Sequence, residues 1–479
     1  MLSTTDEALP SAYFETVNPA TGAKIAKYRL ASIDEATKKL RRARTTYERL
    51  WGKLSVRERA GYLPKLATSL RSRKREYAEL ITTEMGKPIS QSLAEVEKSA
   101  WTAEVYAENA ARWLGEELAS TDAKLSYVAF EPLGVVLSVM PWNFPFWQVF
   151  RFAIPAIVAG NTSVLRHSNV CPGSSLAVER AFEEAGFPEG VFGSVITSHE
   201  VTAKMIGSSY VQGVSFTGSV EAGRSIGEMA AKNLKKFVLE LGGSDPYIVL
   251  DDADAEKAAT VGASARLICS GQSCIAAKRF IVTKGVAKRF SNAFIEEFGK
   301  KKLGDPMDPK TDVGPLATSG QLRTLDLQVR EAVRRGARLS MGGRPGGGRG
   351  TFYEPTVLER VKRGMKVMRE EVFGPVAPIY VAEDDEEAIE VANDSEFGLG
   401  SSLWTSSGEK ARNLASRIES GMVFVNDLVK SDPRMPFGGI KNSGIGRELS
   451  RYGLKEFVNV KSVNIFGIEG VAASPSTVE

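Results

Sequence analysis

The residues between 135 and 250 alternate regularly between strand-like and helical segments, and this pattern limits the possible folds more than any other feature. Expected helices include 172–185, which has a proline early and Gly186 just after its end, and 222–232. Strands that alternate with helices form parallel sheets covered by helices on both faces. We therefore expect an α/β protein with a doubly wound, Rossmann-like sheet here. The expected strands are residues 135–139, 162–165, 191–196, 213–217 and 236–239.

A second α/β region follows Pro246. It begins with an expected strand at 247–250 and a helix capped by Asp252 or Asp254. The glycines at 342–350 have no strand-to-helix context, so we expect a hairpin loop there and no phosphate site. The remaining expected elements are a strand at 279–282, helices at 286–299 and 319–335, and further βα units from 377 to 425.

The segment before the first α/β region is mainly helical. Residues 1–29 look irregular and strand-like, with a turn at 18–22. A first helix is expected after the N-cap Ser32, a long second helix from near residue 55 to Gly86, and a third from near residue 90 past residue 113.

Residues 125–130 alternate as in a strand, residues 131–134 suggest a turn, and a second strand is expected at 135–139. We interpret this strand pair as an oligomerisation arm to which the strand-like tail 459–466 can add, while 469–479 look frayed. The expected division is then a first domain (1–117 and 135–240), a second domain (241–452) and an oligomerisation arm (118–134 and 453–479), and the protein is expected to be a homodimer or homotetramer.

Composition argues against several classes of function. A hydrophobic fraction of 43% and a charged fraction of 25% are those of ordinary soluble proteins, and a net charge of +4 over 479 residues gives no argument for nucleic acid or a membrane surface. The first residues lack the basic and apolar regions of a signal peptide. No apolar run approaches the roughly 18 residues of a membrane span. We expect a cytoplasmic protein with neither nucleic-acid nor membrane partners.

Cysteine and histidine are both scarce. Three cysteines cannot all pair, which favours a reducing cytoplasm without a disulfide framework. With only His167 and His199, we expect no metal site, and a cysteine hydrolase is disfavoured because its thiolate needs an adjacent imidazole. Few glutamines alongside many lysines, arginines and glutamates is a composition typical of thermophiles.

The run Gly271-Gln272-Ser273-Cys274-Ile275-Ala276-Ala277 joins an expected helix to an expected strand. A cysteine on such a glycine-flanked connection can be reached by a ligand, although free cysteine is also among the most buried residue types. Thiol reactivity depends on local surroundings, so this run alone leaves Cys274 either a nucleophile or a packing residue. Cys171 and Cys269 lie in no motif and are interpreted as packing residues.

Two motifs follow strands of the first α/β region. Pro141-Trp142-Asn143-Phe144-Pro145 places an amide donor at the carboxyl end of a strand, where ligands bind in open α/β sheets, or it is simply a packed Trp-Pro turn. Phe216-Thr217-Gly218-Ser219, with Gly223 beyond, has the strand–Gly-Ser–helix layout that suits a dinucleotide phosphate at a helix N-terminus.

Two further motifs contribute carboxylates. Glu240, in Leu239-Glu240-Leu241-Gly242-Gly243, ends a buried strand, and desolvation there would make it a useful base near neutral pH unless it pairs with a lysine. Glu371 and Phe373, in the run 370–375, offer a carboxylate for ribose hydroxyls and a ring that stacks on a flat group.

These motifs in this order, with the run 436–444, closely resemble the aldehyde dehydrogenase superfamily over nearly the whole chain. Within it the chain is most similar to NAD(P)-dependent succinate-semialdehyde dehydrogenases, through the Arg166-His167-Ser168-Asn169 run and the region from Phe437 to Glu448. The resemblance implies oxidation of an aldehyde to its acid by NAD(P). Cys274 would form a thiohemiacetal and then a thioester, Asn143 would hold the oxyanion, and Glu240 would activate the hydrolytic water.

The resemblance also implies that 1–117 and 135–240 form the dinucleotide-binding domain and 241–452 the catalytic domain, and it implies where the cofactor binds. Many members carry Lys-Pro-Ser/Ala-Glu where this chain has Arg166 to Asn169, and the lost acidic group together with a guanidinium fork predicts a preference for NADP, with NAD possible. The alternative is that Arg166 replaces the lysine without changing the preference. The implied cofactor-binding residues are Trp142, Arg166, His167, Ser168, Asn169, Gly218, Ser219, Gly223, Leu241, Glu371 and Phe373.

The substrate is expected to be a small aldehyde, with succinic semialdehyde preferred. Its distal carboxylate needs a cation, and Arg151, Lys430 and Arg434 are candidates, although each is also a common kind of surface charge. Phe144 and Phe437 would form an apolar wall, which suits the alternative of a broad-specificity aliphatic or aromatic aldehyde dehydrogenase. A non-phosphorylating glyceraldehyde-3-phosphate dehydrogenase, a CoA-acylating enzyme and a catalytically silent relative are further alternatives, the last two disfavoured by the presence of Glu240 and Cys274.

Overall fold

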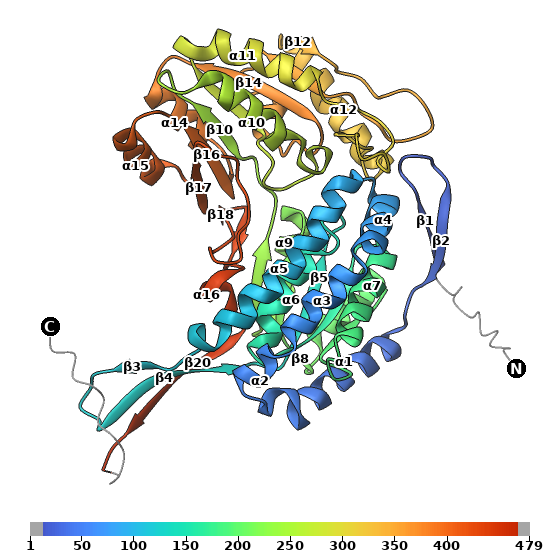
Figure 1. The fold of residues 1–479 in the computed structure, drawn as a ribbon, viewed down its shortest axis with the longest axis vertical. Coiled ribbons are helices and arrows are strands. Elements are labelled where there is room, and N and C mark those ends of the chain that lie inside the picture. Colours follow the sequence, from blue (N-terminus) through green and yellow to red (C-terminus); the bar gives the residue numbers. More distant parts are fainter. Residues whose placement is uncertain (1–12, 468–479) are drawn as a thin grey trace, which may run out of the picture.

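The computed structural model describes residues 13–467, which form two lobes, each built on an open sheet, and a projecting arm of strands (Figure 1). In the first lobe five strands are parallel, as expected, and β19 is antiparallel to β9 at one edge. The order across this sheet is β19 (Gly444–Ile445), β9 (Lys236–Glu240), β8 (Val211–Thr217), β5 (Val135–Met140), β6 (Thr162–His167) and β7 (Phe192–Ser194).

Helices cover both faces of this sheet because its strands are apolar on both sides. Along β5, Val135, Leu137 and Val139 pack in one core with α1 (Ile33–Arg49), α8 (His199–Gly207) and α9 (Val220–Lys232). Val136 and Met140 point into the opposite core, against α6 (Trp147–Val158), α7 (Pro172–Glu184) and the N-terminal helices. This is the doubly wound arrangement that the alternating pattern predicted.

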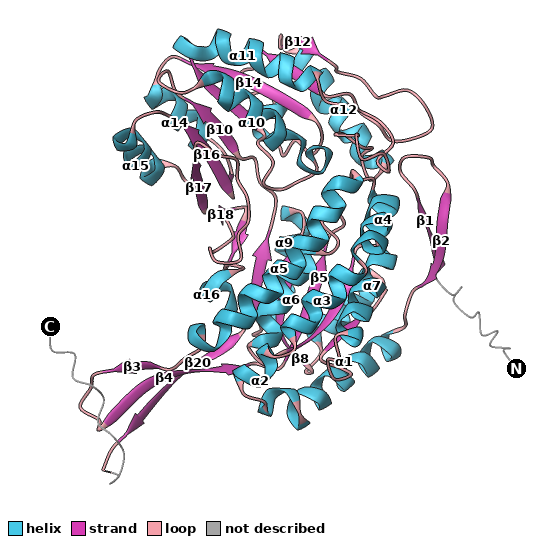
Figure 2. Cartoon of the chain, in the orientation of Figure 1, coloured by secondary structure: helices cyan, strands magenta, loops and turns pink. Residues whose placement is uncertain are grey.

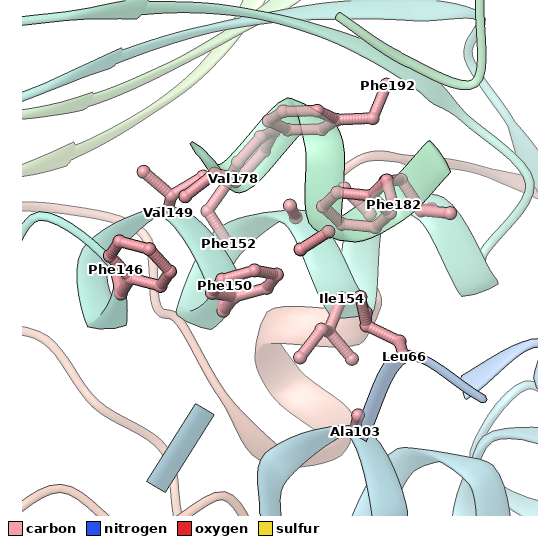
Figure 3. Close-up of a cluster of buried hydrophobic side chains, with 14 of the residues drawn as sticks. Leu66, Ala103, Phe146, Val149, Phe150, Phe152, Ile154, Val178, Phe182 and Phe192 are labelled. Atoms are coloured by element: carbon pink, nitrogen blue, oxygen red, sulfur yellow. The ribbon is translucent and has the colours of Figure 1, made fainter. Parts of the chain in front are cut away.

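The helix α6 is the centre of the larger core, and every one of its residues is buried. Phe150 stacks on Phe182 of α7 with ring centroids 5.6 Å apart, and Phe182 stacks on Phe192 of β7 at 4.4 Å (Figure 3). Burying each such ring stabilises the fold by about 1.5–3 kcal/mol. The core therefore fixes α6, and with it the Pro141–Pro145 turn that precedes this helix.

The prediction of one long helix from residue 55 to Gly86 is wrong. The segment forms α2 (Val56–Ala60), α3 (Leu63–Ser72) and α4 (Lys74–Met85). Pro64 lies in the first turn of α3, where its missing N–H is tolerated. A proline inside a continuous helix would remove a hydrogen bond and clash with the preceding turn, so α3 starts separately from α2. Gly86 ends α4 in the left-handed conformation, with φ of 83°, as its position predicted. The helix α5 (Ile89–Trp113) follows as expected, and a short η1 (Trp51–Lys53) precedes α2.

The second lobe contains a seven-stranded sheet, parallel except for β12. Its order is β12 (Arg338–Met341), β13 (Thr356–Glu359), β14 (Val376–Ala382), β11 (Arg279–Thr283), β10 (Pro246–Val249), β16 (Gly400–Trp404) and β17 (Met422–Val425). The glycine-rich loop joins the antiparallel pair β12–β13, as predicted. The covering helices are α10 (Ala255–Leu267) and α11 (Lys284–Gly299) in one core, and α12 (Ser319–Arg334), α13 (Lys366–Arg369), α14 (Asp385–Asn393) and α15 (Gly408–Arg417) in the other. Figure 2 shows α10, α11, α12, α14 and α15 around the strands of this lobe.

The arm consists of β3 (Glu117–Ala119), β4 (Leu125–Pro132) and β20 (Val458–Ile465), with β20 paired antiparallel along the whole of β4. The predicted pairing of 459–466 with 125–130 is confirmed, but the predicted pairing of 125–130 with 135–139 is wrong because β5 lies between β6 and β8. The expected fraying of 469–479 lies outside the described residues. The shorter elements are β1 (Tyr13–Val17), β2 (Lys24–Arg29), β15 (Phe397–Gly398), β18 (Ile440–Lys441), η2 (Ile268–Gly271) and α16 (Ser450–Leu454). Within 13–467 no helix is long and apolar enough to cross a membrane.

Candidate active site

Four of the motifs meet at one edge of the first sheet. The register pairs Met140 with His167, Val139 with Phe216 and Thr217 with Glu240, so β5, β6, β8 and β9 end side by side. Parallel strands present their carboxyl ends together, which is where open α/β sheets bind ligands. The loop with Cys274 comes from the second lobe and faces this edge: the Asn143 amide donates to the Gln272 carbonyl oxygen at 2.9 Å.

The loop before Cys274 has an unusual backbone. Cys269 and Ser270 both have positive φ, 54° and 56°, and Gly271 follows at 79°. A Cβ on Gly271 would lie 2.2 Å from the Gly374 carbonyl oxygen, so only glycine fits. Hydrogen bonds compensate for this strain, because Cys269 N–H donates to the Gln91 side chain at 2.7 Å. The thiol is thus carried by a loop that is fixed in place.

Two buried cations tie this loop to the 370–375 loop, and motif analysis missed both. Arg266 on α10 donates to the carbonyl oxygens of Gly271 and Ala277 on the loop that carries Cys274 (residues 271–277, the thiol loop). The same guanidinium also donates to Val372 and Gly374. An arginine two turns before a catalytic loop looks like an ordinary helix residue in sequence, so its burial was not predictable from the motif.

Lys278 is the second of these cations and is fully buried. Its ammonium donates to the carbonyl oxygens of Ser273 at 2.8 Å and Cys274 at 2.6 Å. It also lies 3.5 Å from a Glu371 carboxylate oxygen, which accepts from the Gly243 N–H at 3.1 Å. Lys278 therefore connects the backbone of the loop that carries Cys274 with the carboxylate expected to hold the ribose.

Cys274 lies on the boundary between two cavities. One, of about 380 Å³, is lined by Phe144, Trp147, Arg151, Phe437 and the residues around them. The other, of about 290 Å³, is lined by Trp142, Glu371 and Phe373, among others. Two residues, Cys274 and Gln148, line both cavities, and Asn143 lines the second. A thiol reached from two sides can meet a substrate on one and a cofactor on the other.

The electrostatics around this thiol favour its protonated form at rest. Burial raises the pKa of Cys274 to about 12, while the nearby cations Arg151 and Lys278 act in the opposite direction. The Gln148 side chain donates to the Asn143 side-chain oxygen at 3.0 Å, which orients the Asn143 amide nitrogen toward the thiol loop. The site can therefore stabilise negative charge there, but the thiol proton must be removed.

Glu240 is buried at the end of β9, and neither of its carboxylate oxygens has a hydrogen-bond partner. Burial raises its pKa well above the ordinary value, and the neighbouring Glu448 adds to the shift. The carboxylate lies against Gly438 and outside the lining of both cavities, although Phe437, next to Gly438, packs in one cluster with Cys274. Side-chain rotation is needed to bring Glu240 to the thiol.

The second cavity contains most of the residues expected at the cofactor. Gly218, Ser219 and Leu241 line it, and the Trp142 and Phe373 rings meet edge to face at 5.8 Å. A Cβ on Gly223 would lie 2.3 Å from the Leu241 side chain, so α9 approaches this loop as closely as a glycine permits. Ser219 caps α9 by accepting the Ala222 N–H, which leaves a helix N-terminus facing the cavity.

The run from Arg166 to Asn169, at the end of β6, contains residues that suit the cofactor and one that does not. Arg166 is buried, donates to Asn169 at 3.4 Å and to the Thr197 carbonyl oxygen at 3.3 Å, and its Nε has no partner, so it retains capacity for an anion. His167 does not belong to this group: its ring is buried between the Pro145 carbonyl oxygen and Cys171, and burial lowers its pKa to about 4. Ser168 turns the chain, its hydroxyl accepting the Val170 N–H.

The expected substrate residues separate into three groups. Phe144 and Phe437 line the first cavity, but Arg151, also in the lining, is ion-paired with Glu448 and stacked 4.2 Å from the centroid of Phe437. Lys430 lines the cavity and pairs with Asp427.

Arg434 is not brought to the cavity. It is exposed, pairs with Asp432 at 2.7 Å and lies over the Trp101 ring. Two cations of the lining, Lys98 and Lys301, were missed because they lie far from every motif.

A family model, several known proteins and several solved structures are similar to this chain. The model of the aldehyde dehydrogenase family matches residues 5–463. The chain belongs to the aldehyde dehydrogenase family.

Several relatives of this dehydrogenase are similar over nearly their whole lengths. A probable succinate-semialdehyde dehydrogenase [NADP(+)] of Synechocystis is 46% identical, covering 94% of this chain and 98% of the relative. The succinate semialdehyde dehydrogenase [NAD(P)+] Sad of Escherichia coli is 43% identical, covering 95% and 98%. Among solved structures, succinic semialdehyde dehydrogenase from Streptococcus pyogenes in complex with NADP+ superposes with a TM-score of 0.92 at 38% identity, covering 95% of this chain and 100% of that one.

Proposed function

We propose that this aldehyde dehydrogenase oxidises succinic semialdehyde to succinate with NADP. The observation that carries the proposal is the position of Cys274 between two cavities, one lined by cations and aromatic rings and the other by the Gly218–Ser219 turn and Glu371. The succinate-semialdehyde dehydrogenases among the relatives support the choice of substrate.

Cys274 is the nucleophile in this mechanism. Its thiolate attacks the aldehyde carbon and forms a thiohemiacetal, whose oxyanion receives hydrogen bonds from the Asn143 amide and the Cys274 backbone N–H. One such donor contributes about 3 kcal/mol to transition-state stabilisation. Arg151 and Lys278 favour the thiolate, and the thiol proton passes to solvent.

The second half of the mechanism releases the acid. A nicotinamide cofactor bound in the second cavity would supply the hydride acceptor, and loss of hydride from the thiohemiacetal carbon would leave a thioester on Cys274. Glu240 then takes a proton from water, the resulting hydroxide adds to the thioester carbonyl, and the acid and the Cys274 thiolate are released. A carboxylate whose pKa is raised by burial is a base suited to this step near neutral pH.

The chain's residues fit a dinucleotide, and they favour NADP over NAD. The buried Arg166 has an unpartnered Nε, and position 169 carries a neutral amide, so a 2′-phosphate meets a cation and no carboxylate from this motif. The test is kcat/KM with each cofactor for the wild type and for Arg166→Gln. We expect NADP to be favoured in the wild type and the ratio to fall in the variant; a wild-type preference for NAD contradicts the assignment.

Initial rates with succinic semialdehyde, butanal and glyceraldehyde 3-phosphate test the substrate. A large kcat/KM advantage for the semialdehyde supports the proposal. Similar values for semialdehyde and butanal identify a broad-specificity aldehyde dehydrogenase, which the aromatic lining by Phe144, Trp147 and Phe437 favours as the second candidate.

The three-part division into dinucleotide-binding, catalytic and arm segments, a homo-oligomer formed through the arm, and a cytoplasmic location belong to the same proposal. The exposed strand β20 gives the arm an edge that a second copy can extend. Sedimentation of the wild type against a chain truncated before β20 tests this role.

A thermophilic origin also belongs to the proposal. Surface ion pairs form two networks. Arg71 and Lys74 share Glu97, which joins α3, α4 and α5, and Arg73 pairs with Glu76 and Glu184, which joins α4 to α7; such networks accompany high thermal stability. We expect a melting midpoint above the range of about 45–65 °C that is typical of mesophile domains.

A further inference from the structure

The cavity lined by Phe144 and Phe437 carries more cations than the mechanism uses. Its charged lining residues are Glu95, Lys98, Arg151, Lys301, Asp312 and Lys430. Most of these charges are already matched: Arg151 pairs with Glu448, Lys430 pairs with Asp427, and Glu95 accepts the Lys87 ammonium and two backbone N–H groups. Lys98 and Lys301 are the cations of this lining that form no ion pair within the described residues.

Lys98 differs from Lys301 in how firmly it is held. Its ammonium donates to the Ser431 hydroxyl at 2.7 Å and lies 4.5 Å from the centroid of the Trp147 ring, which also lines the cavity. Lys301 follows the C-terminus of α11 beside Lys300 and Lys302, and its side chain makes no hydrogen bond or ion pair within residues 13–467. An ammonium whose one hydrogen-bond partner is a neutral hydroxyl has donors left for an anion.

We propose that Lys98 binds the distal carboxylate of the substrate and so sets the preference for a short aldehyde with a terminal acid. This inference rests on the function proposed above. The lining offers a partner for each end of such a substrate. Cys274 provides a thiol that reacts with the aldehyde, and Lys98, at another part of the lining, provides a cation for the carboxylate. Trp147 and Phe144 supply apolar surface for the methylene groups between them.

The charge of Lys98 adds a pH signature. Burial lowers the pKa of Lys98 to about 8, and the nearby cations Arg151 and Lys430 also lower it, whereas Asp432 and Glu95 act to raise it. The ammonium is therefore present below pH 8 and lost as the pH rises through that value. An arginine at this position stays charged over the whole range.

The experiment measures KM and kcat for succinic semialdehyde and butanal in four proteins: the wild type, Lys98→Met, Lys98→Arg and Lys288→Met. Lys288 is an exposed lysine of α11 and is the matched control. We expect Lys98→Met to raise KM for the semialdehyde by about 10- to 100-fold, the value of a charged hydrogen bond, and to leave KM for butanal within about threefold. The ratio of the two KM values should rise above pH 8 in the wild type and stay flat in Lys98→Arg.

The outcomes separate the two proposals. A wild type that prefers the semialdehyde, combined with a Lys98→Met variant whose KM ratio is unchanged, overturns the role of Lys98 and leaves the function standing. A parallel rise of both KM values in Lys98→Met identifies a packing role and also overturns it. A wild type with equal kcat/KM for both aldehydes overturns the proposed substrate and, with it, a carboxylate site at Lys98.

Discussion

Arg266 should be essential to the geometry of the active site without touching any reactant. Its guanidinium is fully buried and donates to four carbonyl oxygens, two on the thiol loop and two on the loop with Glu371 and Phe373. Lysine at this position keeps the positive charge, but its ammonium is a single donor group and cannot reach all the carbonyl oxygens that the planar guanidinium bonds. Arg266→Lys therefore releases at least one of the two loops.

The cost follows from the number of hydrogen bonds. Each bond from a charged donor contributes about 1.5–3 kcal/mol, and an unsatisfied buried carbonyl costs about 1–3 kcal/mol, so losing one or two bonds should destabilise the fold by about 2–4 kcal/mol. Movement of a reacting group by about 1 Å costs on the order of 100-fold in rate. We expect Arg266→Lys to weaken NADP binding by at least about 10-fold and to lower kcat by a similar factor.

Arg279 provides the matched control. It is equally buried and donates to the carbonyl oxygens of Ser244, Val391 and Ala392, each at 2.8 Å, away from both active-site loops. Urea unfolding midpoints should fall by similar amounts in Arg266→Lys and Arg279→Lys. Calorimetric titration with NADP should show weakened binding in the first alone. Equal losses of affinity in both variants would refute a specific role for Arg266 and leave only a general loss of stability.

Three further predictions concern the site itself. Asn143→Ala should lower kcat by about 100- to 1,000-fold with little change in KM, because it removes one oxyanion donor; steady-state kinetics and an unchanged circular dichroism spectrum check this. Glu240→Gln should keep the rapid first turnover in stopped flow but slow later turnovers by about 100-fold or more. In the wild type, later turnovers should accelerate as pH rises through the raised pKa of Glu240, and Glu448→Gln should move that rise to lower pH. Gly223→Ala should weaken NADP binding several-fold, because its Cβ meets Leu241 at 2.3 Å, whereas Gly227→Ala on the same helix, at 3.3 Å from Leu239, should not.

The parallel sheet and its helices were predictable because hydrophobic periodicity and turn residues act locally. The β6 and β8 strands, the α7 and α9 helices and the left-handed Gly86 all follow from such signals. The error over residues 55–86 has a local cause too, since Pro64 fits an existing helical pattern while starting a new helix. The pairing of β19 with β9 leaves no local signal and was not predicted.

The same distinction explains which site residues could be found. Cys274 and Asn143 lie in compact motifs, and the structure brings the loop of one against the side chain of the other. Arg266, Lys278 and Lys98 carry no motif, and only burial and distance show that they face active-site groups. Arg434 is the opposite case. Its position in the sequence suggested a substrate residue, but its side chain is ion-paired with Asp432 outside the cavity.

The two buried cations under the thiol loop also explain why chemistry here depends on both lobes. Lys278 and Arg266 both belong to the second lobe. Lys278 lies beside the Glu371 carboxylate, and this carboxylate accepts the N–H of Gly243, on the segment that follows β9 of the first lobe. A cofactor bound at the end of the first sheet would therefore contact groups that hold the loop with Cys274. Movement between the lobes would alter cofactor binding and thiol position together, because the same hydrogen bonds support both.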